Sequence, residues 1–122
     1  TRGVRTTFGS RIYQNIVPDV DELLVERVKQ AGAIVIGKTN TPEFTLSGIT
    51  DNLVYGQTNN PYDVSRSPSG SSGGAGAIIA AGGSALDLGS DTGGSIRMPS
   101  HFCGIAGKRA AGTTAKVWAT AN

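Results

Sequence analysis

GSDTGGSIRMPSHFCG, residues 89–104, is the most informative stretch of the sequence because it sets Ser95 directly after paired glycines. Glycines at these positions let successive backbone N–H groups converge on one point without interference from a Cβ atom. Such a group of donors suits the oxyanion of an acyl-transfer intermediate, with Ser95 as the nucleophile. A nucleophilic serine also needs a base, and a lysine kept neutral by desolvation can serve. Lys38, at the end of the apolar run AIVIG at 33–37, is the best candidate.

The composition predicts one soluble domain that works without a cofactor. The chain has 122 residues, of which 38% are hydrophobic, enough for a modest core. Eleven basic residues stand against nine acidic ones, with no charged run of the kind that marks nucleic-acid or membrane-surface binding. One cysteine and one histidine argue against a disulfide framework and a metal centre. Without an apolar signal segment, we expect a cytoplasmic protein.

The hydrophobic pattern predicts an α/β fold. Residues 19–31 form one apolar helical face, with Asp19 and Glu22 as a capping box and Gly32 at the C-terminal end. The short β-branched run at 33–36 predicts a buried strand. The elements expected after it are a long loop at 52–69, a buried helix at 74–83 and a second strand at 84–89. This order is typical of helices packed on a largely buried sheet.

The segment GSSGG at 70–74 allows a rival interpretation. It matches the G-x-S-x-G nucleophile elbow with Ser72 at its centre, and Asp87 or Asp91 and then His101 follow in the order of an α/β-hydrolase esterase triad. Two observations count against it: a polar loop containing proline replaces the strand that an elbow needs, and the acid and the histidine stand too close together. No nucleotide-binding glycine motif is present.

Three separated motifs together resemble the amidase signature family of serine amidohydrolases. They are GKTNTPEF at 37–44, SPSGSSGG at 67–74 and the stretch at 89–104, and the similarity extends over residues 1–107. TTFGS at 6–10 and GQTNNPYDVSRS at 56–67 add to it. The resemblance implies a mixed sheet flanked by helices, here as a fragment truncated at both ends. Residues 108–122 form a tail that does not match the family.

The resemblance also implies a Ser, cis-Ser, Lys triad. Ser95 matches the acylated nucleophile, Ser71 matches the serine that follows a cis peptide bond, and Lys38 matches the lysine. In this arrangement Lys38 takes a proton from Ser71 as Ser71 takes one from Ser95, and the relay reverses to protonate the leaving amine.

The same resemblance assigns the groups around the triad. It implies an oxyanion hole made by the backbone N–H groups of Thr92, Gly93, Gly94 and Ser95. It implies further that three side chains brace the loops and the lysine, namely Ser72, Asp91 and Arg97. Ser69 departs from the family pattern, because glycine is usual there.

The predicted function is hydrolysis of the C–N bond of a small carboxamide through an acyl-enzyme. TPEF at 41–44 favours stand-alone hydrolases over the amidotransferase subunit that acts on charged tRNA. The alternative is an inactive remnant that folds, or associates with copies of itself as a homo-oligomer, without turnover.

Overall fold

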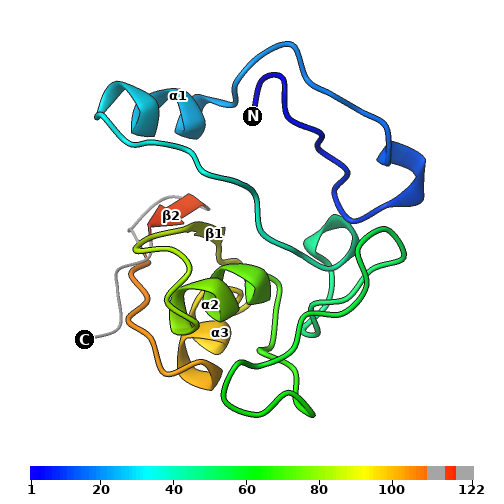
Figure 1. Cartoon of the computed structure of the whole chain (residues 1–122), viewed down its shortest axis with the longest axis vertical. Helices are drawn as coiled ribbons and strands as arrows, with labels where there is room; N and C mark the ends of the chain where they lie inside the picture. Colours follow the sequence, from blue (N-terminus) through cyan, green and yellow to red (C-terminus); the bar gives the residue numbers. More distant parts are fainter. Residues whose placement is uncertain (110–114, 118–122) are drawn as a thin grey trace.

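A computed structural model describes residues 1–109 and 115–117 of the chain, so most of the predicted tail at 108–122 lies outside the described residues. Its helices are the 3₁₀ turns η1 (Arg11–Tyr13) and η2 (Glu43–Thr45) and the α-helices α1 (Leu23–Gln30), α2 (Gly73–Ala80) and α3 (Arg97–Phe102). Its strands are β1 (Leu88–Ser90) and β2 (Ala115–Val117). In Figure 1 the N-terminal part runs as long connections with α1 at one end, while α2, α3 and the strands gather together.

The apolar core lies where α2 packs against α3. Gly76 makes this contact possible, because a Cβ atom there would stand 3.1 Å from Pro99 Cβ and 3.3 Å from Cys103 Sγ. Small residues along α2 therefore let the two helices approach closely. The buried hydrophobic residues of the described chain are Ala75, Ile79, Ile96, Cys103 and Ile105.

The glycines before and within α2 are needed because other segments pass against their backbone. A Cβ atom on Gly70 would stand 2.7 Å from the carbonyl oxygen of Ser47. A Cβ atom on Gly74 would overlap the backbone of Asn40, whose carbonyl accepts a hydrogen bond from Gly74 N at 3.1 Å. At residues 70–74 the glycine-serine run thus packs directly against the N-terminal segments and connects them to the helical core.

The sheet of the described residues is a two-stranded antiparallel one. β1 pairs with β2 in the register Leu88↔Val117, Gly89↔Lys116 and Ser90↔Ala115. Helices and strands of an α/β arrangement are present, but a mixed sheet is not found among the described residues. The predicted strand at 84–89 is wrong before Leu88, where the observed strand begins.

The predicted buried strand at 33–36 is also wrong. These residues form no strand, and Ile34 and Ile36 are 87% and 77% exposed. A β-branched apolar run becomes a buried strand only when a neighbour pairs with its backbone and another layer covers its side chains. Neither a pairing strand nor a covering layer for this run occurs in residues 1–109 and 115–117.

The predicted helices are confirmed with shifted ends. α1 begins at Leu23, because the Glu22 carboxylate caps it by accepting from Leu24 N at 3.1 Å, in place of Asp19. Gly32 follows α1 with a left-handed φ of +89°, as predicted. α2 starts at Gly73 and stops at Ala80, and α3 was not predicted. No helix in the described part of the chain has the length and apolarity to cross a membrane.

Candidate active site

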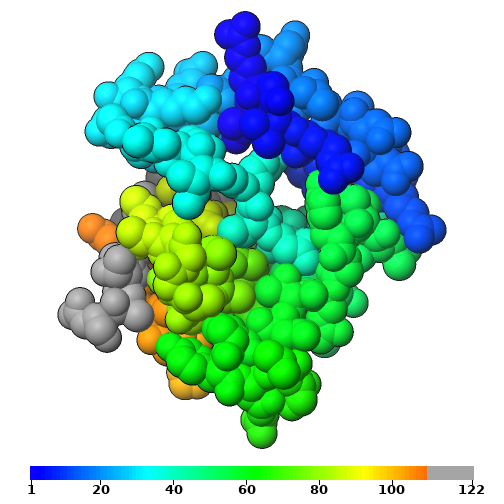
Figure 2. All heavy atoms as spheres, viewed as in Figure 1, coloured from blue at the N-terminus to red at the C-terminus, as the bar shows by residue number. Residues whose placement is uncertain are grey.

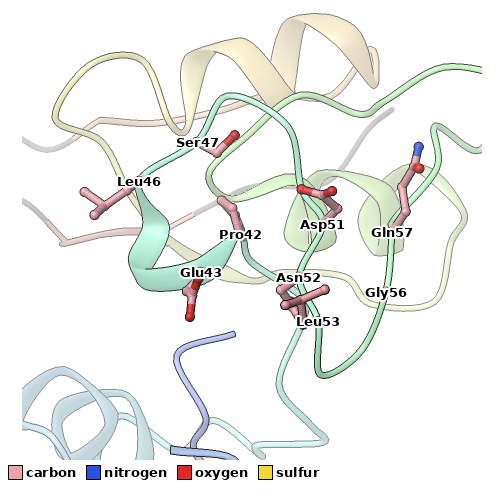
Figure 3. A pocket seen from close by; sticks show the side chains of 9 residues that line it. All are labelled: Pro42, Glu43, Leu46, Ser47, Asp51, Asn52, Leu53, Gly56 and Gln57. Carbon is pink, nitrogen blue, oxygen red and sulfur yellow. The ribbon is translucent and has the colours of Figure 1, made fainter. Parts of the chain in front are cut away.

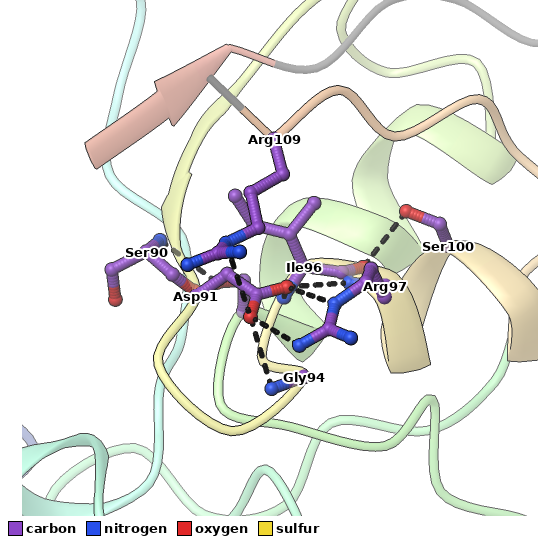
Figure 4. A network of polar contacts seen from close by, with 8 residues as sticks. Ser90, Asp91, Gly94, Ile96, Arg97, Ser100 and Arg109 are labelled. Carbon is purple, nitrogen blue, oxygen red and sulfur yellow. Dashed lines mark hydrogen bonds and ion pairs between the residues drawn. The ribbon is translucent and has the colours of Figure 1, made fainter. Parts of the chain in front are cut away.

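The loop between β1 and α3 is folded around the buried carboxylate of Asp91, which is 1% exposed (Figure 4). This carboxylate accepts hydrogen bonds from the backbone N–H groups of Gly94 (3.0 Å), Ile96 (3.2 Å) and Arg97 (3.2 Å). The guanidinium of Arg97 adds bonds from Nε at 3.1 Å and Nη2 at 3.0 Å. Asp91 therefore fixes the backbone on both sides of Ser95.

Charge stabilises this arrangement. The hydrogen bonds from the Arg97 side chain, helped by three backbone N–H groups, hold the pKa of Asp91 well below its ordinary value, although burial opposes them. Arg109 Nε lies 4.0 Å from Asp91 Oδ1 and adds a second cation. Asp91 is thus ionised at neutral pH, and its bond to Gly94 N accompanies a φ of +121° at Gly94, a conformation that favours glycine.

Ser95 lies half-buried between Gly94 and Ile96, which are both buried. Of the four amides predicted to form an oxyanion hole, that of Gly94 donates to Asp91. The amides of Thr92, Gly93 and Ser95 have no acceptor within the part of the chain that the structure describes. Three N–H groups beside the candidate nucleophile therefore remain available to an oxygen of a ligand.

The SPSGSSGG loop lies directly against the loop of residues 91–96, which carries the candidate nucleophile and is named the nucleophile loop for that reason. Ser71 is 2% exposed, and the peptide bond between Gly70 and Ser71 is cis, as the resemblance implies. Ser72 N donates to the carbonyl of Ser95 at 3.1 Å. The Ser72 hydroxyl lies 3.4 Å from both the carbonyl oxygen and the amide nitrogen of Ser90. Ser72 thus joins the loop that carries Ser71 to both ends of the loop that carries Ser95.

Lys38 does not meet the two serines in this structure. Its Nζ donates to Thr6 Oγ1 at 2.6 Å, and no hydrogen bond connects it to Ser71 or Ser95 among the described residues. Burial lowers the pKa of Lys38, which is the direction that a general base requires. The structure therefore brings the two serine loops together and leaves the lysine bonded to the N-terminal segment.

Two asparagines that the sequence analysis did not single out hold the lysine segment in place. The Asn40 side chain donates to Gly56 O and Thr58 Oγ1, both at 3.0 Å. Asn52 donates to Asn40 Oδ1 at 2.6 Å and to Thr41 O at 2.8 Å. Asn40 belongs to the GKTNTPEF motif, so its motif was visible in the sequence, whereas nothing in the sequence marked Asn52.

The elbow interpretation receives no support from the geometry. Ser72 directly precedes α2, but a loop and not a strand leads to it. His101 is exposed on α3, with its ring 5.6 Å from that of Phe102, and makes no described contact with Ser72. Burial raises the pKa of Asp87, against hydrogen bonds from Thr39 and Leu88. The three groups of an esterase triad are therefore not assembled here.

A cavity of about 350 Å³ beside η2 is separate from the predicted site residues (Figure 3). Its walls come from residues 42–57, among them the carboxylates of Glu43 and Asp51. None of the residues predicted to take part in catalysis lines it. The cavity therefore adds nothing to the candidate active site.

The chain belongs to the amidase family, because the family model described as Amidase matches residues 1–113. This match confirms the resemblance drawn from the three motifs and reaches beyond residue 107. The curated relatives include glutamyl-tRNA(Gln) amidotransferase subunits from Prochlorococcus marinus (strain MIT 9303) and from Sulfolobus acidocaldarius, each 50% identical over 107 residues. Each alignment covers 88% of this chain and 22% of the relative, so the chain spans about a fifth of their length.

Solved structures agree with this assignment. A glutamyl-tRNA(Gln) amidotransferase subunit from Thermotoga maritima is 45% identical with a TM-score of 0.83, over 86% of this chain and 23% of that one. A 6-aminohexanoate cyclic dimer hydrolase complexed with substrate is 28% identical with a TM-score of 0.89, over 99% of this chain and 29% of that one. The relatives thus comprise both amidotransferase subunits and hydrolases, and they give no preference to the stand-alone hydrolases that TPEF favours.

Proposed function

We propose that this chain carries the acyl-transfer centre of an amidase, with Ser95 as the nucleophile that cleaves a carboxamide C–N bond. The observation that carries the proposal is the loop organised by Asp91, which leaves the N–H groups of Thr92, Gly93 and Ser95 available beside the serine. N–H donors fixed before the reaction stabilise a developing oxyanion without reorganisation. Membership of the amidase family supports the same chemistry.

In the proposed reaction Ser95 Oγ forms a bond to the amide carbonyl carbon. The hydroxyl proton passes to Ser71, whose own proton passes to the base. The carbonyl oxygen becomes an oxyanion held by the free amides, and its collapse breaks the C–N bond as the leaving nitrogen takes a proton back. Water then attacks the acyl-enzyme ester, which releases the carboxylic acid and restores Ser95.

Lys38 is the base named by the family resemblance, and it must leave Thr6 to act. Its segment passes the serine loop, because Asn40 O accepts from Gly74 N at 3.1 Å. Two residues of extended chain span about 7 Å, so the Lys38 backbone lies within about 7 Å of Asn40. Burial lowers the pKa of Lys38, which is the direction that a base requires. The bond to Thr6 speaks against this role in the conformation described.

A second candidate function is that of an amidotransferase component. It is favoured by curated relatives of that name at 49–51% identity. An amidotransferase must break the C–N bond of its amide donor, so Ser95 would have the same role. Carboxamide turnover by the chain alone would favour the hydrolase, whereas turnover only after addition of the other amidotransferase subunits would favour the second candidate.

Self-association is part of the proposal as well. Large apolar side chains are exposed at Ile34, Ile36, Leu46 and Ile12, each at 77% or more. Exposed apolar patches and unpaired extended segments favour association with another chain or sheet. We expect a homo-oligomer on a size-exclusion column with light-scattering detection, and a monomer there would argue against it.

The test of the nucleophile is covalent labelling of the purified chain with a fluorophosphonate probe, followed by mass spectrometry of the adduct. Wild type is compared with Ser95→Ala, Ser71→Ala and Lys38→Ala. Ser84→Ala is the control, because among the described residues its hydroxyl bonds only the backbone oxygen and nitrogen of nearby Leu86. We expect an adduct on Ser95 that is lost in Ser95→Ala and unchanged in the control. Circular dichroism of each variant confirms that it is folded.

Each outcome has a distinct meaning. Loss of labelling in Lys38→Ala supports the relay through Ser71, whereas full labelling there keeps Ser95 and removes Lys38 as the base. An adduct on Ser72 that depends on His101 would revive the elbow. Absence of any adduct on a folded sample would overturn the proposed function and leave an inactive remnant.

A further inference from the structure

A second cavity, of about 670 Å³, lies between three segments of the N-terminal part. Residues 4–9 form one wall, residues 38–41 another, and Tyr55, Gln57 and Thr58 a third. Figure 2 shows an opening where the blue N-terminal segment meets the cyan and green segments. The volume is sufficient for a small organic molecule.

The charge of this cavity is entirely positive. Arg5 and Lys38 line it, and no aspartate or glutamate does. Neither cation forms an ion pair with any residue that the structure describes. Both side chains are exposed at the cavity, so an anionic ligand would meet two positive charges that no carboxylate compensates.

Each of the two cations has a local contact. Lys38 Nζ bonds to Thr6 Oγ1 at 2.6 Å, and Arg5 is the preceding residue. The Arg5 guanidinium carbon lies 5.2 Å from the centre of the Tyr55 ring, a cation–π contact that restrains the side chain. Both charges are thus positioned before any ligand arrives.

The rest of the lining combines hydroxyl and aromatic groups. Six of the lining residues are threonines, and Phe8 and Tyr55 are the two aromatic ones. Phe8 is 53% exposed, so its ring offers apolar surface to a ligand. A bare inorganic anion would use the cations alone, whereas an organic anion would use the cations and the aromatic surface.

We propose that this cavity binds a small organic carboxylate, with its charged end at Arg5 and Lys38 and its apolar body toward Phe8. Carboxylates suit guanidinium and ammonium donors through charge-assisted hydrogen bonds. The inference goes beyond the proposed function, because it concerns binding and not the reactivity of Ser95. The two proposals share Lys38, which binds the carboxylate as an ammonium bonded to Thr6 and acts as the base only after it leaves Thr6 and loses its proton.

The test is calorimetric titration of the full chain with 4-phenylbutyrate and, in parallel, with the neutral isostere 4-phenylbutyramide. Because a charge-assisted bond is lost with the amide, we expect it to bind at least about tenfold more weakly than the acid. Arg5→Gln and Lys38→Gln should each weaken binding of the acid by about fivefold or more. Arg5→Lys keeps the charge and should retain most of the affinity.

Arg27→Gln on α1 is the matched control, because Arg27 lines neither cavity. Equal affinity for acid and amide, or no binding of the acid at up to about 10 mM, would overturn the proposal. So would an equal loss in Arg27→Gln, or phosphate displacing the acid with higher affinity. A Ser95 adduct in the fluorophosphonate experiment without carboxylate binding would overturn this inference and leave the proposed function intact. Carboxylate binding without an adduct would support this inference and overturn the proposed function.

Discussion

The two halves of the chain differ in what they bury. Every buried hydrophobic residue of the described chain lies between Ala75 and Ile105. In residues 1–66 the buried positions are occupied by proline, glycine and small polar residues: Thr7, Gly9, Ser10, Pro42, Thr50 and Asn60. The half that carries the two serine loops therefore rests on its own apolar core, whereas the N-terminal half is held mainly by polar contacts.

The largest expected effect tests this difference directly with two isoleucines. Ile96 is 0% exposed and Ile36 is 77% exposed. Ile96→Ala should lower the free energy of unfolding by about 3–4 kcal/mol, because it leaves a cavity in the core. Ile36→Ala should change it by less than about 0.5 kcal/mol. Urea unfolding followed by circular dichroism measures both, and similar losses in the two variants would remove the distinction between the halves.

The next largest effect is expected at the contact between the two halves, where Gly74 packs against Asn40. A Cβ atom at Gly74 would overlap the backbone of Asn40, whereas one at Gly37 would have nothing within 4 Å. Gly74→Ala should therefore destabilise the protein by about 3 kcal/mol, since backbone and not a flexible side chain must move. Gly37→Ala is the matched control and should be close to wild type in the same urea titration. A Gly74→Ala protein as stable as this control would contradict the contact.

A smaller effect is expected at the nucleophile loop. Asp91→Asn removes the charge that orders the amides of Gly94, Ile96 and Arg97, and should cost about 2 kcal/mol together with most of the Ser95 labelling. Asp63→Asn, which alters an exposed pair with Arg66, should leave both unchanged. Retained labelling in a folded Asp91→Asn protein would show that the loop does not need its anionic anchor.

The same carboxylate predicts a dependence on pH. Because the pKa of Asp91 is lower in the folded than in the unfolded state, its stabilisation is present above the unfolded value and is lost progressively below about pH 5. The free energy of unfolding of wild type should thus fall more steeply than that of Asp91→Asn between about pH 7 and pH 3.5. Parallel curves would contradict this assignment.

The sequence predicted the half that carries the two serine loops better than it predicted the N-terminal half. The three motifs indicated the family, the family resemblance supplied the cis bond before Ser71, and the run of small apolar residues at 74–83 indicated the helix α2. The strand at 33–36 failed, because burial of an apolar run depends on partners distant in sequence. The Thr6 contact of Lys38 was missed for the same reason: its partners are 32 residues apart.

The smallest expected effect concerns this contact. Thr6→Val removes the acceptor of Lys38 Nζ and should lower the free energy of unfolding by less than about 1 kcal/mol, since the bond is exposed. The local effect should be clearer: trypsin should cleave after Arg5 faster in Thr6→Val than in wild type, because the N-terminal segment is less restrained. Thr45→Val is the control, because that hydroxyl bonds only the adjacent Phe44 carbonyl. Equal cleavage rates in wild type and both variants would show that the bond does not restrain the N-terminal segment.

The hydrogen bonds to the Asp91 carboxylate order the nucleophile loop at a small cost in conformational entropy. Its amide partners lie three, five and six residues further along the chain. Closing such short loops costs little conformational entropy, and that cost does not depend on the distant segments. The hydrogen bonds that Asp91 makes to these amides are therefore local, so this part of the loop can keep its turn through rearrangements of the polypeptide that leave Ser72 and its bonds to Ser90 and Ser95 in place.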